Sequence, residues 1–121
     1  MTQKGYQDLI VWQKGFALVV AVYTLTNQLP KNEMFGLVSQ LRRSAVSIPS
    51  NIAEGYGRKS DAEFNRFLLI AKGSLFELET QLLLVKKLNL IPNYNTAELD
   101  QLLIETSKLI YAFLKKLGTR D

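Results

Sequence analysis

Residues 34–52 read MFGLVSQLRRSAVSIPSNI and hold the pattern that decides the fold. Apolar residues recur in this stretch at alternating steps of four and three, which places them on one side of an α-helix: Met34, Val38, Leu41, Ala45, Ile48 and Ile52. The opposite side carries small and polar residues: Gln40, Ser44, Ser47, Asn51, Glu54 and Arg58. This two-sided pattern predicts a helix over about residues 33–57 that packs its apolar side into a helical bundle.

Pro49 lies inside this predicted helix. Proline has no backbone N–H, so it cannot donate to the carbonyl of Ala45, and its ring crowds the preceding turn. Because the apolar spacing continues through Ile52, we predict that Pro49 bends the helix without ending it. Gly55 and Gly57 follow shortly afterwards, and we interpret them as the stop signal of the helix.

Apolar residues at helical spacing predict three further helices, over residues 8–29, 60–89 and 96–117. Each of them begins at a typical N-cap residue: Asp8, Ser60 and Thr96. Glu63 follows Ser60 at the spacing of a capping box. Because the connections are short, neighbouring helices are expected to be antiparallel. The sequence therefore predicts an all-α, up-down-up-down four-helix bundle in a single domain over residues 1–121.

Composition excludes most catalytic chemistry. The chain has 121 residues, of which 47% are hydrophobic, and it contains no cysteine and no histidine. It therefore lacks thiol nucleophiles, histidine bases and the usual ligands of structural zinc. The segment Gly55-Tyr56-Gly57 lacks the spacing of a phosphate-binding loop. We expect a protein that is not an enzyme and that uses no cofactor, no metal and no small-molecule substrate.

The location of the protein is predicted from two absences. The segment Met1–Tyr6 is polar and lacks the apolar core of a secretion signal. The longest apolar run falls far short of the roughly 20 residues that span a bilayer. Together these features predict a cytoplasmic protein that does not enter a membrane.

The balance of charge favours a polyanionic partner, because the formal net charge is +4. Between residues 42 and 72 only Glu54, Asp61 and Glu63 oppose the basic side chains. Tyr56 lies among these charges and can stack on a nucleic-acid base. We predict a nucleic-acid-binding surface composed of Arg42, Tyr56, Arg58, Lys59, Arg66 and Lys72. For one protomer an ordinary charged surface is the favoured interpretation, whereas an oligomer would repeat the charges and sum their field.

Leu69, Phe76 and Leu83 recur every seven residues on the side of the third predicted helix that is nearly opposite to its core residues. Their exposure would be costly, because burial of each large apolar side chain is worth about 1.5–3 kcal/mol. We predict that this stripe is the interface of a homo-oligomer. The alternative is that long loops or the chain termini cover it.

The polar side of the second predicted helix has two open interpretations. It is either a solvated face or a close-packed polar seam, since serine side chains allow two helix backbones to approach. In the second case Arg43, Glu54 and Glu77 can pair across the seam. A buried pair of this kind would specify geometry more than it would stabilise the fold.

The run Gln40–Gly55, QLRRSAVSIPSNIAEG, resembles the signature of a four-helix-bundle family named for 23S rRNA intervening sequences and also labelled S23 ribosomal protein. The resemblance continues in DLIVWQK at residues 8–14, EFNRF at 63–67 and AKGSLFELE at 71–79, and it covers about residues 6–117. The matching residues of the main motif, which we interpret as structural, are Arg42, Arg43, Ser47, Pro49, Asn51, Glu54 and Gly55.

This resemblance implies a bacterial, homo-oligomeric and pentameric bundle whose gene lies in an intervening sequence of an rRNA gene. A similar protein is the accessory variability determinant of diversity-generating retroelements, a basic pentameric barrel that binds nucleic acid and a reverse transcriptase. No catalytic residue is implied. The leading hypothesis is a non-enzymatic homopentamer that binds RNA or DNA by charge and shape. The alternative is a protein-interaction adaptor, such as an accessory factor to a reverse transcriptase or another enzyme.

Overall fold

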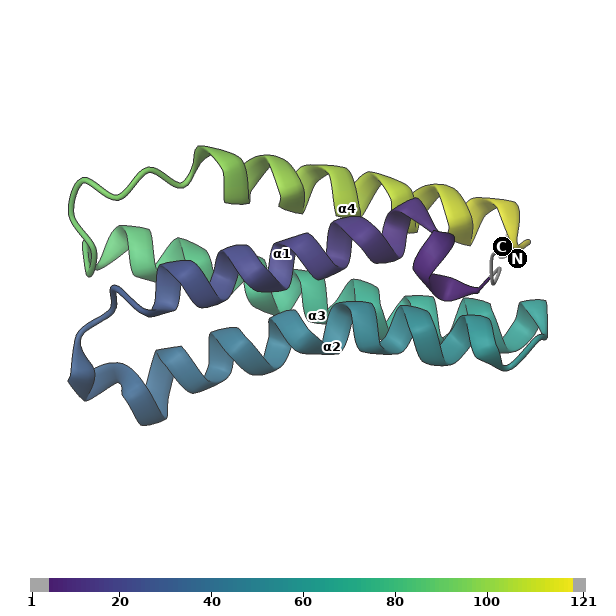
Figure 1. Cartoon of the computed structure of the whole chain (residues 1–121), viewed down its shortest axis with the longest axis horizontal. Helices are drawn as coiled ribbons and strands as arrows, with labels where there is room; N and C mark the ends of the chain where they lie inside the picture. Colours follow the sequence, from purple (N-terminus) through teal and green to yellow (C-terminus); the bar gives the residue numbers. More distant parts are fainter. Residues whose placement is uncertain (1–4, 119–121) are drawn as a thin grey trace.

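Four α-helices account for most of the part of the chain that the computed structural model describes, residues 5–118. They are α1 (Ile10–Thr26), α2 (Ser39–Gly57), α3 (Asp61–Lys87) and α4 (Ala97–Lys116). Three short helical turns precede α1 and α2: η1 (Tyr6–Asp8), η2 (Lys31–Glu33) and η3 (Met34–Val38). No strand occurs between residues 5 and 118. Successive helices run in opposite directions along the long axis (Figure 1). The prediction of an all-α chain with four helices is confirmed.

The hydrophobic core lies between the four helices and includes the predicted seam of α2. Five of the six seam residues are buried: Val38, Leu41, Ala45, Ile48 and Ile52. Met34 is exposed, because it precedes the break in the backbone at Gly36, whereas Val38 follows that break and is buried. Helix α3 packs along α2, and α1 contacts both α2 and α4. The alternating spacing of the sequence therefore identified the core side of α2 correctly.

Helix α1 is shorter at both ends than the predicted range 8–29. The N-cap prediction for Asp8 is wrong, because Asp8 belongs to η1 and the extended backbone of Leu9 (φ −76°, ψ 127°) separates it from α1. At the other end the helix stops at Thr26. The N–H of Leu29 then bonds to the carbonyl of Thr26 at 3.1 Å, in a tight turn that leads into Pro30.

The predicted second helix begins later than residue 33. Residues 31–38 form the turns η2 and η3, and the backbone of Gly36 inside η3 is not helical (φ −110°, ψ −105°). Glycine is a poor helix former, so a break at this position is inexpensive. The break leaves the side chain of Phe35 97% exposed at the tip of the α1–α2 connection.

Helix α2 continues without interruption from Ser39 to Gly57, with Pro49 buried inside it. The prediction that the residues after Pro49 remain helical is confirmed. A methyl group added to Gly15 of α1 would lie 3.6 Å from Cβ of Pro49. The proline ring thus faces a glycine on the neighbouring helix, and the bend itself stays a prediction.

Gly55 is not a helix stop, which corrects the interpretation from the sequence. It lies buried within α2, and a methyl group added there would be only 2.6 Å from Cβ of Phe67 on α3. The side chain is therefore absent because two helices approach each other closely. Gly57 does end the helix, and Lys59 then adopts a left-handed backbone (φ 60°) that turns the chain towards α3.

The predicted caps of α3 and α4 differ in outcome. Ser60 caps α3 as predicted, since its hydroxyl oxygen accepts the backbone N–H of Glu63 at 3.2 Å. Thr96 occupies the N-cap position of α4, but its hydroxyl donates to Asp100 at 2.9 Å and does not cap the backbone. The N–H of Ala97 bonds instead to Oδ1 of Asn95 at 2.9 Å. Asn95, one position earlier, therefore supplies the cap that was expected from Thr96.

Candidate nucleic-acid interface

The turn between α2 and α3 brings three of the predicted basic residues together. The guanidinium groups of Arg58 and Arg66 lie over the ring of Phe67, at 5.0 and 4.5 Å from its centroid. Lys59 occupies the turn between the two helices. Phe67 was not predicted for this surface, and no sequence signal shows that Arg58 reaches it across the turn. A planar guanidinium stacks well on an aromatic face, so the ring fixes the orientation of both groups.

Carboxylates accompany these cations. Nη2 of Arg58 lies 2.9 Å from Oε2 of Glu54, and Nη1 lies 3.6 Å from Oε1 of Glu63. Nη2 of Arg66 lies 3.1 Å from the same Glu63 oxygen. The hydrogen bond from Arg66 lowers the pKa of Glu63 and the same bond raises the pKa of Arg66. Glu63 is therefore ionised at neutral pH and holds the two arginines in place.

The formal charge of this surface is close to balanced within one chain. The three cations Arg58, Lys59 and Arg66 face three acidic residues on the same segment: Glu54, Asp61 and Glu63. Within residues 5–118, Lys59 forms no salt bridge, in contrast to both arginines. Lys59 thus supplies the least compensated positive charge of the turn.

Arg42 lies at the other end of α2, about 24 Å from Arg58 along the helix axis at 1.5 Å per residue. Its Nε donates to Oγ1 of Thr26 at 2.9 Å, and its Nη2 donates to Oδ1 of Asn27 at 3.0 Å. The guanidinium also lies 4.4 Å from the ring centroid of Tyr23. Arg42 therefore joins the start of α2 to the C-terminal end of α1, where a cation is favoured by the helix dipole.

Lys72 is also separate from the turn. Its ammonium group lies 5.9 Å from the ring centroid of Phe76, in the middle of α3. The structure thus places Lys72 beside the apolar stripe and leaves Arg58, Lys59, Arg66 and Tyr56 as the group that meets at the α2–α3 turn. Tyr56 is partly exposed and packs edge-on against Phe64, with ring centroids 5.7 Å apart.

The small polar residues of α2 form a seam with α3. Ser44 donates to Oε1 of Gln81 at 2.8 Å, and the hydroxyls of Ser47 and Ser74 are 2.8 Å apart. Asn51 donates from Nδ2 to the carbonyl and hydroxyl oxygens of Ser47, at 2.7 and 2.9 Å. Of the two interpretations left open, these contacts favour the close-packed seam.

The predicted charge pairing across this seam does not occur. Arg43 donates from Nη2 to Oε1 of Gln40 at 2.8 Å, within its own helix. Glu54 bonds to Arg58 at the C-cap of its own helix, and Glu77 is exposed on α3. The charged side chains lie at the flanks of the seam, where partners on the same helix are nearer than those across the interface.

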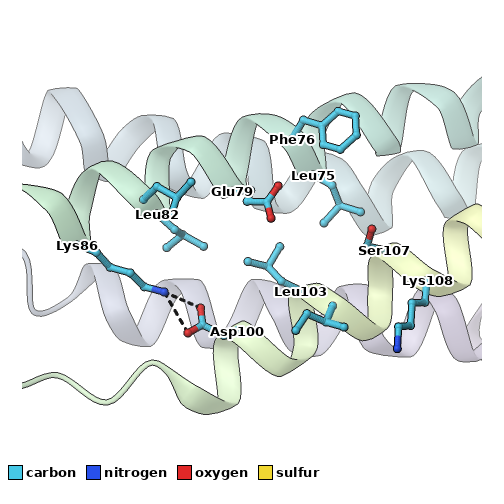
Figure 2. Close-up of a pocket in the computed structure, with 11 residues that line it drawn as sticks. Leu75, Phe76, Glu79, Leu82, Lys86, Asp100, Leu103, Ser107 and Lys108 are labelled. Carbon is cyan, nitrogen blue, oxygen red and sulfur yellow. Dashed lines mark hydrogen bonds and ion pairs between the residues drawn. The ribbon is translucent and has the colours of Figure 1, made fainter.

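The predicted apolar stripe is exposed along α3. Leu69, Phe76 and Leu83 have exposed fractions of 48%, 57% and 59%, so the described residues 5–118 do not cover it. Beside the stripe, a groove of about 380 Å³ runs between α3 and α4, with Leu75, Leu82 and Leu103 among its lining residues. Figure 2 shows Lys86 and Asp100 spanning the groove, with Nζ 3.0 Å from Oδ1.

Two features of the described residues bear on other classes of function. Between residues 5 and 118, no group of three or more acidic side chains is arranged to hold a metal ion. In the same part of the chain, no helix combines the length and the apolar character needed to cross a membrane.

The fold and the candidate site define a class: a helical bundle with a closed apolar core, a polar α2–α3 seam, an uncovered apolar stripe and a charged end. The family model described as 23S rRNA-intervening sequence protein matches residues 7–112. The chain therefore belongs to this family, and the resemblance seen in the sequence is confirmed at that level. No curated protein matches the chain. The similarity to the accessory variability determinant stays a prediction.

Proposed function

We propose that the protein is a non-enzymatic homo-oligomer that binds RNA or DNA by charge and shape through the α2–α3 turn. The observation that carries this proposal is the convergence of Arg58, Lys59, Arg66 and Tyr56 at one end of the bundle. Membership of a family named for an intervening sequence of 23S rRNA supports a nucleic-acid partner. Backbone phosphates would provide most of the affinity, with little dependence on base sequence.

The salt bridges to Glu54 and Glu63 do not prevent phosphate binding. Exposed ion pairs contribute only about 0–1 kcal/mol, so a phosphate can compete for the same donors. Each guanidinium has five N–H donors, and Glu54 and Glu63 occupy only part of them on Arg58 and Arg66. Because Phe67 keeps both guanidiniums oriented, little conformational freedom is lost when a phosphate binds.

Self-association would increase the affinity of the α2–α3 turn for nucleic acid, which is low in a single chain because its charges nearly balance. The chain exposes the stripe of α3 and, on α1, a second set of apolar residues that includes Ile10, Phe16 and Val20. Two different apolar surfaces on one chain suit a head-to-tail contact, which closes into a ring when the rotation permits. In a ring whose axis follows the helices, every α2–α3 turn lies at the same end, and the field of each Lys59 adds to the others. Five subunits is the expected number.

A protein-interaction adaptor is the second candidate function. The observation that favours it is Phe35, whose side chain is 97% exposed and follows the exposed Met34 at the α1–α2 connection. An aromatic side chain this exposed is suited to insertion into a pocket of a partner protein. Under this alternative the partner would be an enzyme that needs an accessory factor, such as a reverse transcriptase.

Salt-dependent binding tests the main proposal. Fluorescence anisotropy with labelled RNA, single-stranded DNA and duplex DNA should show affinities that fall steeply with salt, with a slope of about −0.9 per neutralised phosphate for duplex DNA and about −0.7 for single strands. Replacing Arg58, Lys59 and Arg66 together by glutamine should weaken binding to unrelated sequences alike and flatten the slope.

The matched control removes the same formal charge at the other end of the bundle, by replacing Lys31, Lys86 and Lys87 with glutamine. That variant should keep most of the affinity. A wild-type protein that binds none of the three nucleic acids at low salt would refute the proposal and favour the adaptor.

A further inference from the structure

A pocket of about 590 Å³ lies between η1 and the α2–α3 turn. Its lining includes Tyr6, Tyr56, Phe64, Lys59 and Asp61. The volume falls within the range of roughly 300–1,000 Å³ that is typical of small-ligand sites. The lining residues come from η1, from the end of α2 and from the start of α3. The turn between α2 and α3 lies at the end of the bundle where α1 begins (Figure 1).

Two partly exposed tyrosines form the aromatic part of this pocket. Tyr6 is 36% exposed and Tyr56 is 39% exposed. Each ring is braced by a second aromatic side chain: Tyr6 by Trp12, with centroids 5.3 Å apart, and Tyr56 by Phe64, with centroids 5.7 Å apart. Both contacts are edge-to-face, so the tyrosines are held in position and can stack on a flat ligand at little entropic cost.

The charges of the pocket favour a ligand that carries both a negative group and hydrogen-bond donors. Lys59 supplies an ammonium group that no salt bridge within residues 5–118 neutralises. Asp61 supplies a carboxylate in the same pocket. The two charges balance, so a free inorganic phosphate gains little there. A nucleotide is better matched, because its phosphate can pair with Lys59, its flat base can stack on tyrosine and its amino groups can donate to Asp61.

We propose that this pocket binds one unpaired nucleotide of a single-stranded nucleic acid, with the base stacked on Tyr56 and Tyr6 and the phosphate paired with Lys59. The inference deepens the proposed function and rests on it. In a duplex both faces of each base are covered by neighbouring bases, so the pocket selects single strands over duplexes. The two neighbouring arginines, which are oriented on Phe67, then contact the phosphates on either side.

Fluorescence of the single tryptophan, Trp12, reports on this pocket because its ring contacts Tyr6. The probes are a 12-nucleotide single-stranded RNA, single-stranded DNA of the same sequence, the corresponding blunt RNA duplex, and inorganic phosphate. Either single strand should bind more tightly than the duplex and should change the Trp12 emission. Inorganic phosphate should not change it. The RNA and DNA arms show which of the two the site accepts.

Variants assign the effect to the pocket. Tyr56→Ala should lower the affinity for the single strand by about 5- to 150-fold, the effect typical of removing one aromatic side chain that stacks on a base, and should lower the affinity for the duplex much less. Tyr56→Phe should retain the wild-type affinity, because it keeps the ring that stacks on the base. Tyr111→Ala, at an exposed tyrosine on α4, is the control and should have no effect.

The outcomes separate the two proposals. If single strand and duplex bind equally and Tyr56→Ala has no effect, the pocket inference is wrong and the proposed function stands. If neither binds at low salt, both are wrong. If Tyr56→Ala is unfolded by circular dichroism, Tyr6→Ala decides the question: an unchanged ratio of single-strand to duplex affinity would overturn the inference.

Discussion

Gly55 is the residue at which one methyl group determines how closely α2 and α3 can pack. In Gly55→Ala the new Cβ would lie 2.6 Å from Cβ of Phe67, so one of the helices must move. Overpacking of this kind costs about 1–3 kcal/mol, and we expect the free energy of unfolding to fall by that amount in urea denaturation. The control is Gly57→Ala, because a methyl group there meets no atom within 4 Å. Equal stability of the two variants would contradict the close-approach interpretation.

Glu63 is the residue that balances the charge of Arg58 and Arg66. Glu63→Gln keeps the side-chain shape but removes a carboxylate beside both arginines, so we expect tighter binding of nucleic acid and a steeper salt dependence. Anisotropy titrations measure this, with Glu98→Gln on α4 as the control. Unchanged affinity in Glu63→Gln would show that the arginines do not contact phosphate.

The pH dependence of stability follows from the same carboxylate. The hydrogen bond from Arg66 lowers the pKa of Glu63 below its ordinary value of 4.5. A lowered pKa means that the folded state favours the ionised form of Glu63. The stabilisation by this carboxylate is therefore present above pH 4.5 and is lost as the pH falls through the folded-state pKa. The difference in melting temperature between wild type and Glu63→Gln should therefore shrink as the solution is acidified below pH 4.5.

At the scale of the element, α2 shows what one proline does inside a continuous helix. Pro49→Ala would restore a backbone donor to the carbonyl of Ala45 and improve helix propensity, a change worth up to about 3 kcal/mol. It would also straighten the helix and move the α2–α3 turn. We expect a higher melting temperature together with weaker nucleic-acid binding, and Ser50→Ala as control should change neither. Raised stability with unchanged affinity would show that Pro49 does not position the turn.

The elements were predictable from the sequence where periodicity governs them. The spacing from Val38 to Ile52 identified the buried side of α2, and Ser60 identified the start of α3. The failures arise where a local signal competes with tertiary structure. From the sequence, Gly55 is predicted to end a helix. In the structure, the glycine is required because Phe67 of α3 approaches too closely for a side chain at this position. Thr96 reads as a cap, but Asn95 satisfies the backbone and leaves the threonine to bond with Asp100.

The site was less predictable than the fold, because its composition depends on distances through space. Arg42 lies in α2 and Arg58 at its C-cap, and as charges in the sequence the two are equivalent, yet Arg42 holds α1 and α2 together. Lys72 lies beside Phe76, away from the turn. The part that periodicity did predict is the exposure of Leu69, Phe76 and Leu83 on α3.

At the scale of the whole molecule, the uncovered stripe predicts the state of assembly. Light scattering at micromolar concentration should give a mass above that of one chain, with five chains expected. Phe76→Glu should reduce it to the mass of a monomer while far-UV circular dichroism stays helical, because Phe76 is 57% exposed and adds little to the core. Leu88→Glu, at an exposed position just after α3, is the control. A monomeric wild-type protein would refute the oligomer.

The position of the first residues of α1 and the last residues of α4, at the same end of the bundle as the α2–α3 turn (Figure 1), governs how the protein should be handled. Helix α1 begins and α4 finishes at the end of the bundle where α2 meets α3, while the α1–α2 and α3–α4 connections lie at the other end (Figure 1). An affinity tag, fluorophore or surface linkage attached next to the start of α1 or the end of α4 would therefore lie close to the surface that is to be measured (Figure 1). Attachment through a cysteine introduced at Asn32, an exposed residue in the α1–α2 connection, would leave that surface open to the solution.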